Sequence, residues 1–204
     1  MVHGTRKSIL MGAVFVVFVI FVGVGLKIYS VNANALTVPK ESYSIGARVN
    51  MDGAFVQKVS ENTQGYSWRV NSIEKVSYNE YVKRFTQSSL AVDGRDVPSI
   101  VLLEVTIRNE GNTDGFLNVM ECYLIPKRAN TYFIIDSSLW QLAEPNAPSD
   151  IGALTLVPDT EYTTYIPYVA NISEEKVYTQ AIPDTSFDLR ISNGSVSKSI
   201  ELSI

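Results

Sequence analysis

The pattern of apolar and polar residues changes sharply near residue 27 and divides the chain into two parts. From Ser8 to Leu26 no residue is charged, and apart from Ser8 and three glycines every residue is apolar. A helix packed on the core of a soluble protein would have a polar stripe, and this segment has none. Nineteen residues at about 1.5 Å per residue span about 28 Å, close to the roughly 30 Å hydrocarbon core of a bilayer. The pattern predicts a transmembrane helix, with the whole anchor at residues 8–27.

Two interpretations of this segment compete. A cleavable signal peptide has an apolar region of about 7–15 residues followed by a small-residue cleavage site, and Ala33-Asn34-Ala35 resembles such a site. However, the apolar run is longer than that range and ends well before the site. We therefore expect an uncleaved signal anchor. Arg6 and Lys7 precede it, which favours a cytoplasmic tail at 1–7 and an extracellular C-terminal domain in a single-pass protein of the cell membrane.

After this segment the patterns are mostly those of strands. Residues 28–45 contain serine, asparagine, alanine and one proline with little periodicity and predict a tether, so the folded domain is expected at 46–204. Apolar and polar residues alternate over 101–108 and over 187–192, which is typical of half-buried strands. Asn193-Gly194 then provides residues that tolerate positive φ in a two-residue hairpin turn. The return strand is expected at 196–204, and further strands at 54–59, 67–76, 116–125, 131–136, 153–157 and 161–169.

One short helix interrupts the predicted strands. Ser77 precedes apolar residues with helical spacing, and Glu80 follows it three residues later. This is the capping box, in which each of the two side chains accepts a hydrogen bond from a free backbone N–H. The sequence therefore predicts a helix at about 78–87 on an all-β domain, an immunoglobulin-like antiparallel β-sandwich.

The order of these elements resembles a known family. Residues 60–70 begin with a polar stretch and end in a predicted strand, and the predicted helix at 78–85 follows. The strand at 102–109 then leads into a polar turn that ends at Gly115. This order is similar to that of the uncharacterised, membrane-anchored immunoglobulin-like domains of Gram-positive bacteria. The resemblance covers roughly residues 45–204. It implies an exported β-sandwich behind an N-terminal anchor and carries no catalytic residue across.

Charge and composition exclude several function classes. The 204 residues include 17 basic and 21 acidic side chains, a net charge of −4. The first 35 residues contain three of the basic residues and none of the acidic ones, so the remainder carries −7. This balance offers no electrostatic footprint for nucleic acid and no evident basic patch for an anionic lipid surface. One cysteine excludes a disulfide framework and a zinc ribbon.

The usual catalytic groups are sparse. The single histidine, His3, lies in the predicted cytoplasmic tail, and Cys122 lies in an apolar segment without a histidine to lower its pKa. The pattern S-x-x-K, which marks some penicillin-interacting enzymes, occurs at Ser72, Ser173 and Ser195. That chemistry needs the serine and the lysine on one face of a helix, and two of the three pairs fall in predicted strands. We expect no enzymatic activity and no cofactor.

A calcium-loop motif is the most specific local match. Glu110, Asn112, Asp114 and Glu121 fit the EF-hand spacing around Gly115, except that the first position is glutamate. The last glutamate must curl back to the ion, yet the residues from 116 to 121 have the pattern of an extended strand, which would place it about 20 Å away. We expect a hairpin loop here and no metal.

Aromatic residues offer one further hypothesis. The chain contains 11 tyrosines and two tryptophans, and these residue types are favoured at interfaces. Tyr132, Phe133 and Trp140 lie beside the proline-containing stretch 143–150 and form a candidate interaction face. The alternative is that these residues belong to the core and corners of the sandwich.

The sequence therefore predicts a membrane-tethered extracellular binding module with an unidentified ligand. Its expected partners are the lipid bilayer, through the N-terminal helix, and an envelope or exported protein, with no role for nucleic acid. An immunity or export-accessory protein of the cell envelope is one alternative, and an envelope enzyme with an unrecognised site is another.

Overall fold

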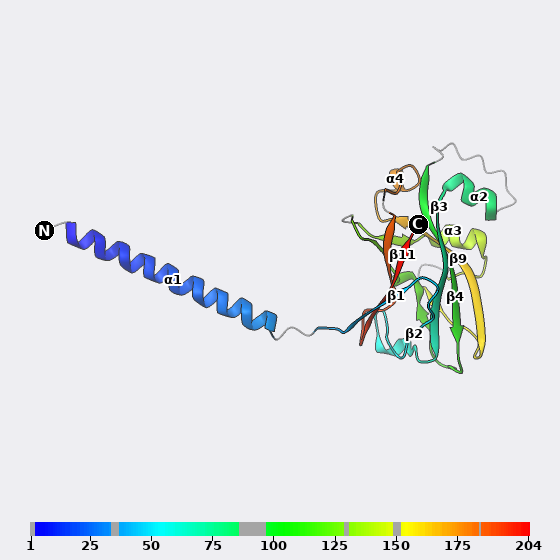
Figure 1. Ribbon diagram of the computed structural model, residues 1–204, viewed down its shortest axis with the longest axis horizontal. Helices are drawn as coiled ribbons and strands as arrows, with labels where there is room; N and C mark the ends of the chain where they lie inside the picture. The colour runs from blue at the N-terminus through cyan, green and yellow to red at the C-terminus, as the bar shows by residue number, and fades with distance from the viewer. Residues whose placement is uncertain (1–2, 34–36, 86–96, 129–130, 149–151, 184) are drawn as a thin grey trace. The chain divides into compact units, whose positions relative to one another are not determined.

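The computed structural model describes residues 3–33, 37–85, 97–128, 131–148, 152–183 and 185–204 (Figure 1). The chain forms two compact units, Met1–Thr37 and Val38–Ile204. The first contains the helix α1 (His3–Ala33) and the second contains all the strands.

Helix α1 has 31 residues, and its stretch Phe15–Ala33 is long and apolar enough to cross a membrane, a property that signal sequences share. The predicted tether at 28–45 is wrong at both ends. Residues 28–33 continue the helix, since neither glycine nor proline follows Gly25 to end it. Residues 40–44 form a strand, because they pair in register with the last strand of the domain.

The second unit is mostly β, as predicted, and its main sheet has nine strands in the order β1-β11-β10-β6-β7-β9-β4-β3-β2. All neighbours are antiparallel except β1 and β11, which are parallel. These strands are β1 (Lys40–Ser44), β2 (Val49–Asn50), β3 (Tyr66–Ser77), β4 (Pro98–Asn109), β6 (Leu124–Pro126), β7 (Phe133–Ile135), β9 (Thr160–Ala170), β10 (Ser186–Arg190) and β11 (Ser197–Ser203). A small second sheet joins β5 (Leu117–Asn118) to β8 (Ala153–Leu154).

The main sheet curls until one segment of chain occupies both of its edges. Strands β1 and β2 are consecutive, yet β1 pairs with β11 and β2 pairs with β3. Between them the N–H of Gly46 donates to the carbonyl of Val70 on β3 (2.9 Å). The pairing therefore forms one continuous, barrel-like sheet and does not divide the strands into the two separate sheets of a sandwich.

The core lies inside the curled sheet, and the alternation in the sequence identifies its residues. On β4 the residues predicted to point inward, Val101 to Ile107 in steps of two, are all fully buried. On β3, Trp68 and Val70 point inward, and the register then shifts between Val70 and Ser72. This bulge reverses which face each later residue of the strand occupies, so Val76 lies on the outer face.

Two helices cover that outer face, α2 (Tyr78–Phe85) and α3 (Ser137–Ala143) (Figure 1). They bury a second apolar cluster that includes Ile100 and Leu102 of β4. The first half of β4 is therefore buried on both faces, which explains why its sequence there is continuously apolar.

Side-chain caps start both helices. The N–H of Glu80 donates to Ser77 Oγ (3.1 Å), so the predicted start of α2 is confirmed; the last two residues of the predicted helix, 86 and 87, lie outside the described residues. The N–H of Leu139 donates to Asp136 Oδ1 (3.0 Å) at the start of α3, a helix that the periodicity did not predict. Two short 3-10 helices, η1 (Val59–Glu61) and η2 (Val119–Glu121), and the four-residue α4 (Glu174–Val177) complete the set.

The predicted two-residue turn of the C-terminal hairpin is wrong. Strands β10 and β11 form the predicted antiparallel pair, but their connection runs from residue 191 to 196 and the positive φ is at Ser195. The N–H groups of Asn193 and Gly194 both donate to the carbonyl of Phe55 (2.9 Å each). A Cβ at Gly194 would lie 2.0 Å from the Phe55 ring, so this glycine is required for close approach.

In the predicted strand at 54–59, the strand-like pairing found among the described residues is a single isolated bridge from Phe55 to Gly194. Beyond it, the buried carboxylate of Glu61 accepts the N–H groups of Val56, Gln57 and Lys58 and curls the backbone into η1. The strand predicted at 116–125 is likewise interrupted by η2, and the one at 153–157 is reduced to β8.

Buried tyrosines predict a loss of stability at alkaline pH. Tyr81 is fully buried and donates to the carbonyl of Leu139 (2.8 Å), and burial raises the pKa of its hydroxyl well above the usual value. Burial and a hydrogen bond to Asp136 raise the pKa of Tyr178 as well. The unfolded chain releases these protons at about pH 10 and the folded chain retains them, so stability is present below pH 10 and is lost as the pH rises above it.

We expect the free energy of unfolding of the full chain in mild detergent to fall progressively above about pH 10. Tyr81→Phe should reduce stability at neutral pH by about 1 kcal/mol, through the lost hydrogen bond, and should make the alkaline fall less steep. Denaturant unfolding followed by tryptophan fluorescence measures both quantities. Tyr132→Phe, at an exposed position, is the control, and an equal effect of the two variants would contradict the prediction.

Candidate functional site

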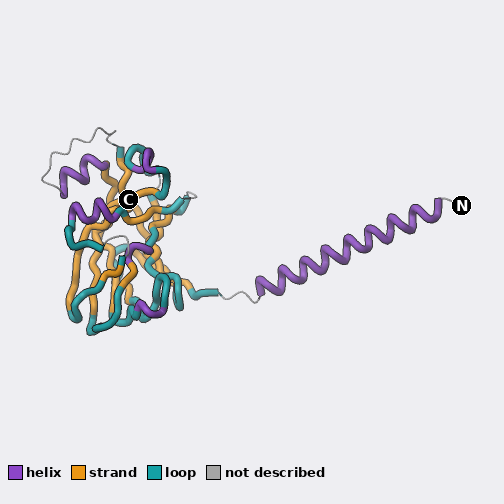
Figure 2. The backbone as a smooth tube through the Cα atoms, turned by 180° about the vertical axis from the view of Figure 1, so that it is seen from behind, coloured by secondary structure: helices purple, strands orange, loops and turns teal. Residues whose placement is uncertain are grey.

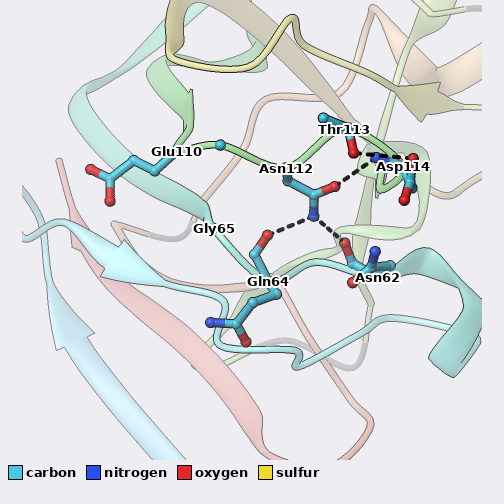
Figure 3. A pocket seen from close by; sticks show the side chains of 8 residues that line it. Asn62, Gln64, Gly65, Glu110, Asn112, Thr113 and Asp114 are labelled. Carbon is cyan, nitrogen blue, oxygen red and sulfur yellow. Dashed lines mark hydrogen bonds between the residues drawn. The ribbon is translucent and has the colours of Figure 1, made fainter.

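Helix α2 follows the end of β3. At the opposite end of the sheet, where β3 begins and β4 ends, several loops meet (Figures 1 and 2). We call residues 58–65, 109–116 and 155–159 the loop platform. An open pocket of about 500 Å³ lies on it (Figure 3). The residues that line this pocket are Asn62, Gln64, Gly65, Glu110, Gly111, Asn112, Thr113 and Asp114.

Asn112 joins two of these loops, because its side-chain amide donates two hydrogen bonds and accepts two (Figure 3). Its Nδ2 donates to the carbonyls of Asn62 and Gln64 (2.6 Å each). Its Oδ1 accepts the N–H groups of Asp114 (3.0 Å) and Gly115 (2.6 Å). The side chain thereby closes its own turn and fastens that turn to the loop before β3.

Asn109 and Tyr66 bring in the third loop. Asn109 Nδ2 donates to the carbonyls of Asn112 and Leu156 (2.8 Å each), and its Oδ1 accepts the N–H of Asn112 (2.9 Å). The Tyr66 hydroxyl donates to the carbonyl of Gly115 (3.1 Å) and accepts the N–H of Leu156 (3.2 Å). Both residues are fully buried, so three loops are cross-linked from within.

Two glycines allow the loops to approach this closely. A Cβ at Gly115 would lie 1.9 Å from the carbonyl oxygen of Asn62, and one at Gly65 would lie 2.5 Å from that of Glu110. Gly65 also has a positive φ of 83°. Larger residues at either position would separate the loops.

Three of the four residues of the calcium-loop motif, Glu110, Asn112 and Asp114, lie in this platform, and the structure gives the motif residues other roles. The amide of Asn112 is fully used within the loops, and Glu110 pairs with Arg108 (3.2 Å). Glu121 lies in η2, not in an extended strand, and accepts a hydrogen bond from the Tyr123 hydroxyl, which raises the pKa of Tyr123 to about 12. Within the described residues, no group of three His, Cys, Asp or Glu side chains could hold a metal ion.

Two exposed apolar side chains lie on the loops of the platform. Val59 on η1 is 77% exposed, and Val157, in the loop before β9, is 71% exposed. Each lies on a segment that the platform cross-links, the first through Asn62 and the second through Leu156. The platform therefore carries both exposed apolar side chains and a polar, partly acidic pocket.

The structure separates the three predicted interface aromatics. Trp140 is fully buried on α3, and its Nε1 donates to Thr164 Oγ1 (2.9 Å). Phe133 is buried on β7 against Phe187. Tyr132 alone of the three is exposed, with its ring 5.2 Å from that of Tyr123. Phe133 and Trp140 therefore have core roles.

The candidate nucleophiles lie in structural positions. Cys122 is buried, and burial raises the pKa of its thiol. Lys75 donates to the carbonyl of Ile182 (2.9 Å), and Lys198 is buried in ion pairs. Ser173 does precede a helical turn, but it is exposed and α4 has only four residues.

The fold and the platform define a small, mostly-β domain that follows an apolar N-terminal helix and carries a cross-linked set of loops. The chain belongs to the family described as a domain of unknown function, DUF5028, whose model matches residues 40–198. Comparison with curated proteins and with solved structures found no match. The matched range begins at β1, which agrees with the role of that strand in the sheet.

Asn112→Asp should loosen the platform. The change removes the Nδ2 donor and with it the hydrogen bonds to the carbonyls of Asn62 and Gln64. Each such bond contributes about 0.5–1.5 kcal/mol, so losing both costs about 1–3 kcal/mol. We expect a loss of this size in the free energy of unfolding of the full chain, measured in mild detergent by denaturant titration. Thr113→Ala, in the same loop, is the control and should stay within about 0.5 kcal/mol of the wild type. Equal stability of the two variants would show that Asn112 does not fasten the loops.

Proposed function

We propose that the protein is a membrane-tethered binding module that presents its loop platform to another protein at the outer side of the cell membrane. The observation that carries the proposal is the combination of internally fixed loops with exposed apolar side chains. Asn109, Asn112 and Tyr66 hold the loops in one arrangement, while Val59 and Val157 project into solvent. A fixed surface loses little conformational freedom on binding, and apolar side chains within a polar rim are typical of protein interfaces.

The membrane part of the proposal rests on α1. Arg6 and Lys7 precede the apolar run, and Lys27 and Tyr29 follow it. Basic and aromatic residues at these positions are typical of the two interfaces of a bilayer. We propose that α1 remains as an uncleaved single-pass anchor and that the domain lies outside the cell.

We infer that the curled sheet is a variant of the immunoglobulin-like sandwich. In support, the segment 40–50 passes from one sheet edge to the other, as corner strands of sandwiches do. The core residues of β3, β4, β10 and β11 also meet in a single cluster.

Protease added to intact cells, or to protoplasts of cells that have a wall, tests the orientation. We expect digestion of the domain without lysis and retention of the α1 fragment in the membrane fraction. Digestion only after lysis would reverse the orientation, and a mature N-terminus after residue 33 would show that the segment is cleaved.

Site-specific photo-crosslinking tests the platform. A photoreactive amino acid placed at Val59 or at Val157 of the full chain, in its native membrane, should give a discrete adduct with one partner protein. The same probe at Leu142 on α3, which is also exposed, is the control. A probe at Thr113, in the same platform, should give an adduct with the same partner, and this adduct should disappear when the chain also carries Val59→Asp and Val157→Asp. Adducts of equal yield at Leu142, or none at either valine, would refute the platform as the binding surface.

A further inference from the structure

A second hollow, of about 210 Å³, lies on the outer face of the sheet where β1, β11, β10 and β6 run side by side. Strand alternation places its lining residues on this face. Phe187, Leu189, Ile200 and Leu202 point into the core, so the residues between them point outward. The lining residues are Lys40, Ile125, Asp188, Arg190, Ser197 and Ser199.

The hollow exists because small side chains alternate with long ones across neighbouring strands. Ser197 lies opposite Lys40 on β1, and Ser199 lies opposite Arg190 on β10. The two serines form the floor, and the long basic side chains rise on either side of it.

Two carboxylates of this face, Asp188 and Glu201, share one cation, and Asp188 Oδ1 is buried without a hydrogen-bond partner among the described residues. Lys127 Nζ lies 3.4 Å from Asp188 Oδ1 and 3.4 Å from Glu201 Oε2. Ser42 Oγ also donates to Glu201 (3.0 Å). The negative charge that the hollow would otherwise present is therefore shared with a cation outside it.

The two cations of the hollow have no such compensation. Neither Lys40 nor Arg190 forms an ion pair with any residue that the structure describes, whereas Arg48, Arg84 and Arg108 each pair with a glutamate. Two uncompensated cations beside one hollow repel each other, and an anion bound between them would remove that repulsion. The hydroxyl of Ser197 has no hydrogen-bond partner among the described residues either, so it is available as a donor.

We propose that this hollow binds the phosphate group of a phosphate ester. Arg190 can offer two parallel N–H donors to phosphate oxygens, Lys40 can offer a mobile ammonium, and the serine hydroxyls of the floor can offer further donors. A lipid headgroup and a soluble phosphate ester present the same group, so both are sources of the ligand. The site is separate from the loop platform and does not depend on its function.

The test uses the full chain in a non-ionic detergent, with two probes at millimolar concentration. Glycerol phosphate represents the soluble ester, and short-chain phosphatidylglycerol represents the headgroup. Sodium chloride at matched ionic strength is the blank. We expect a saturable rise in melting temperature with at least one probe. A response to glycerol phosphate supports a site for free phosphate esters, and a response to the lipid alone supports a headgroup site.

Arg190→Gln and Lys40→Gln should each weaken binding by about tenfold, the effect of one charge-assisted hydrogen bond. Their melting temperatures without probe establish that the variants are folded. Lys83→Gln, at an exposed lysine on α2, removes the same charge elsewhere and should bind like the wild type. The proposal is overturned if neither probe exceeds the chloride blank, or if Lys83→Gln weakens binding as much as Arg190→Gln does.

Discussion

A buried lysine joins the two edges of the sheet. Lys198 Nζ on β11 donates to the carbonyl of Asn50 at the end of β2 (2.6 Å), and it lies 3.0 Å from Asp52 and 3.6 Å from Glu41. Its side chain is only 5% exposed, and a buried ammonium is costly unless it is paired and hydrogen-bonded. The charge is therefore tolerated only while β1, β2 and β11 remain together. Lys198 thus links the pairing of β1, at one edge of the sheet, to the position of β2, at the other edge.

Both candidate sites depend on this closure. Lys40, one wall of the anion hollow, is positioned by the parallel pairing of β1 with β11. On the other side, the segment that follows β2 continues toward the platform, where the hydroxyl of Thr63 donates to the carbonyl of Ala54 (2.6 Å). Phe55 on the same segment receives the N–H groups of the β10–β11 turn. The edge that closes the sheet therefore also supports the loop before β3.

The hydrophobic pattern correctly predicted the strands in which core-facing residues recur at every second position. The alternation in 101–108 and 187–192 corresponds to β4 and β10, the strand expected at 161–169 corresponds to β9, and the Ser77 cap corresponds to the start of α2. It failed where a hydrogen bond to a group outside the segment decides the backbone path. The carboxylate of Glu61 curls 56–58, and Phe55 reshapes the turn at 193–194. Helix α3 had a local indication in Asp136, an N-cap residue three positions before Leu139, which the strand pattern obscured.

The two sites differ in how far the sequence could reveal them. The loop at 109–116 resembles a calcium loop in sequence. A turn that needs asparagine, aspartate and glycine for its geometry contains the same residue types as a calcium loop. In the structure the asparagine is satisfied by backbone groups, so the motif marks a turn. The anion hollow has no local pattern at all. Its two cations are 150 residues apart, and the chain is acidic overall, so the net charge gives no indication of a face on which two basic side chains lack ion pairs.

Paired charges explain why that face differs from the rest of the domain. Elsewhere on the domain, arginines near the sheet are held in ion pairs: Arg48, just before β2, pairs with Glu161 on β9, and Arg84 on α2 pairs with Glu74 on β3. Such exposed pairs contribute little stability, but each offsets a positive charge with a negative one. Lysine on an exposed edge strand also discourages pairing with another sheet, and this suffices to explain Lys40 alone. It does not explain Arg190, which lies two strands inward, is half-buried and is flanked by small hydroxyl residues. A guanidinium in such a position loses part of its hydration without gaining an ion pair, and this is the physical reason to expect that an anion completes its surroundings.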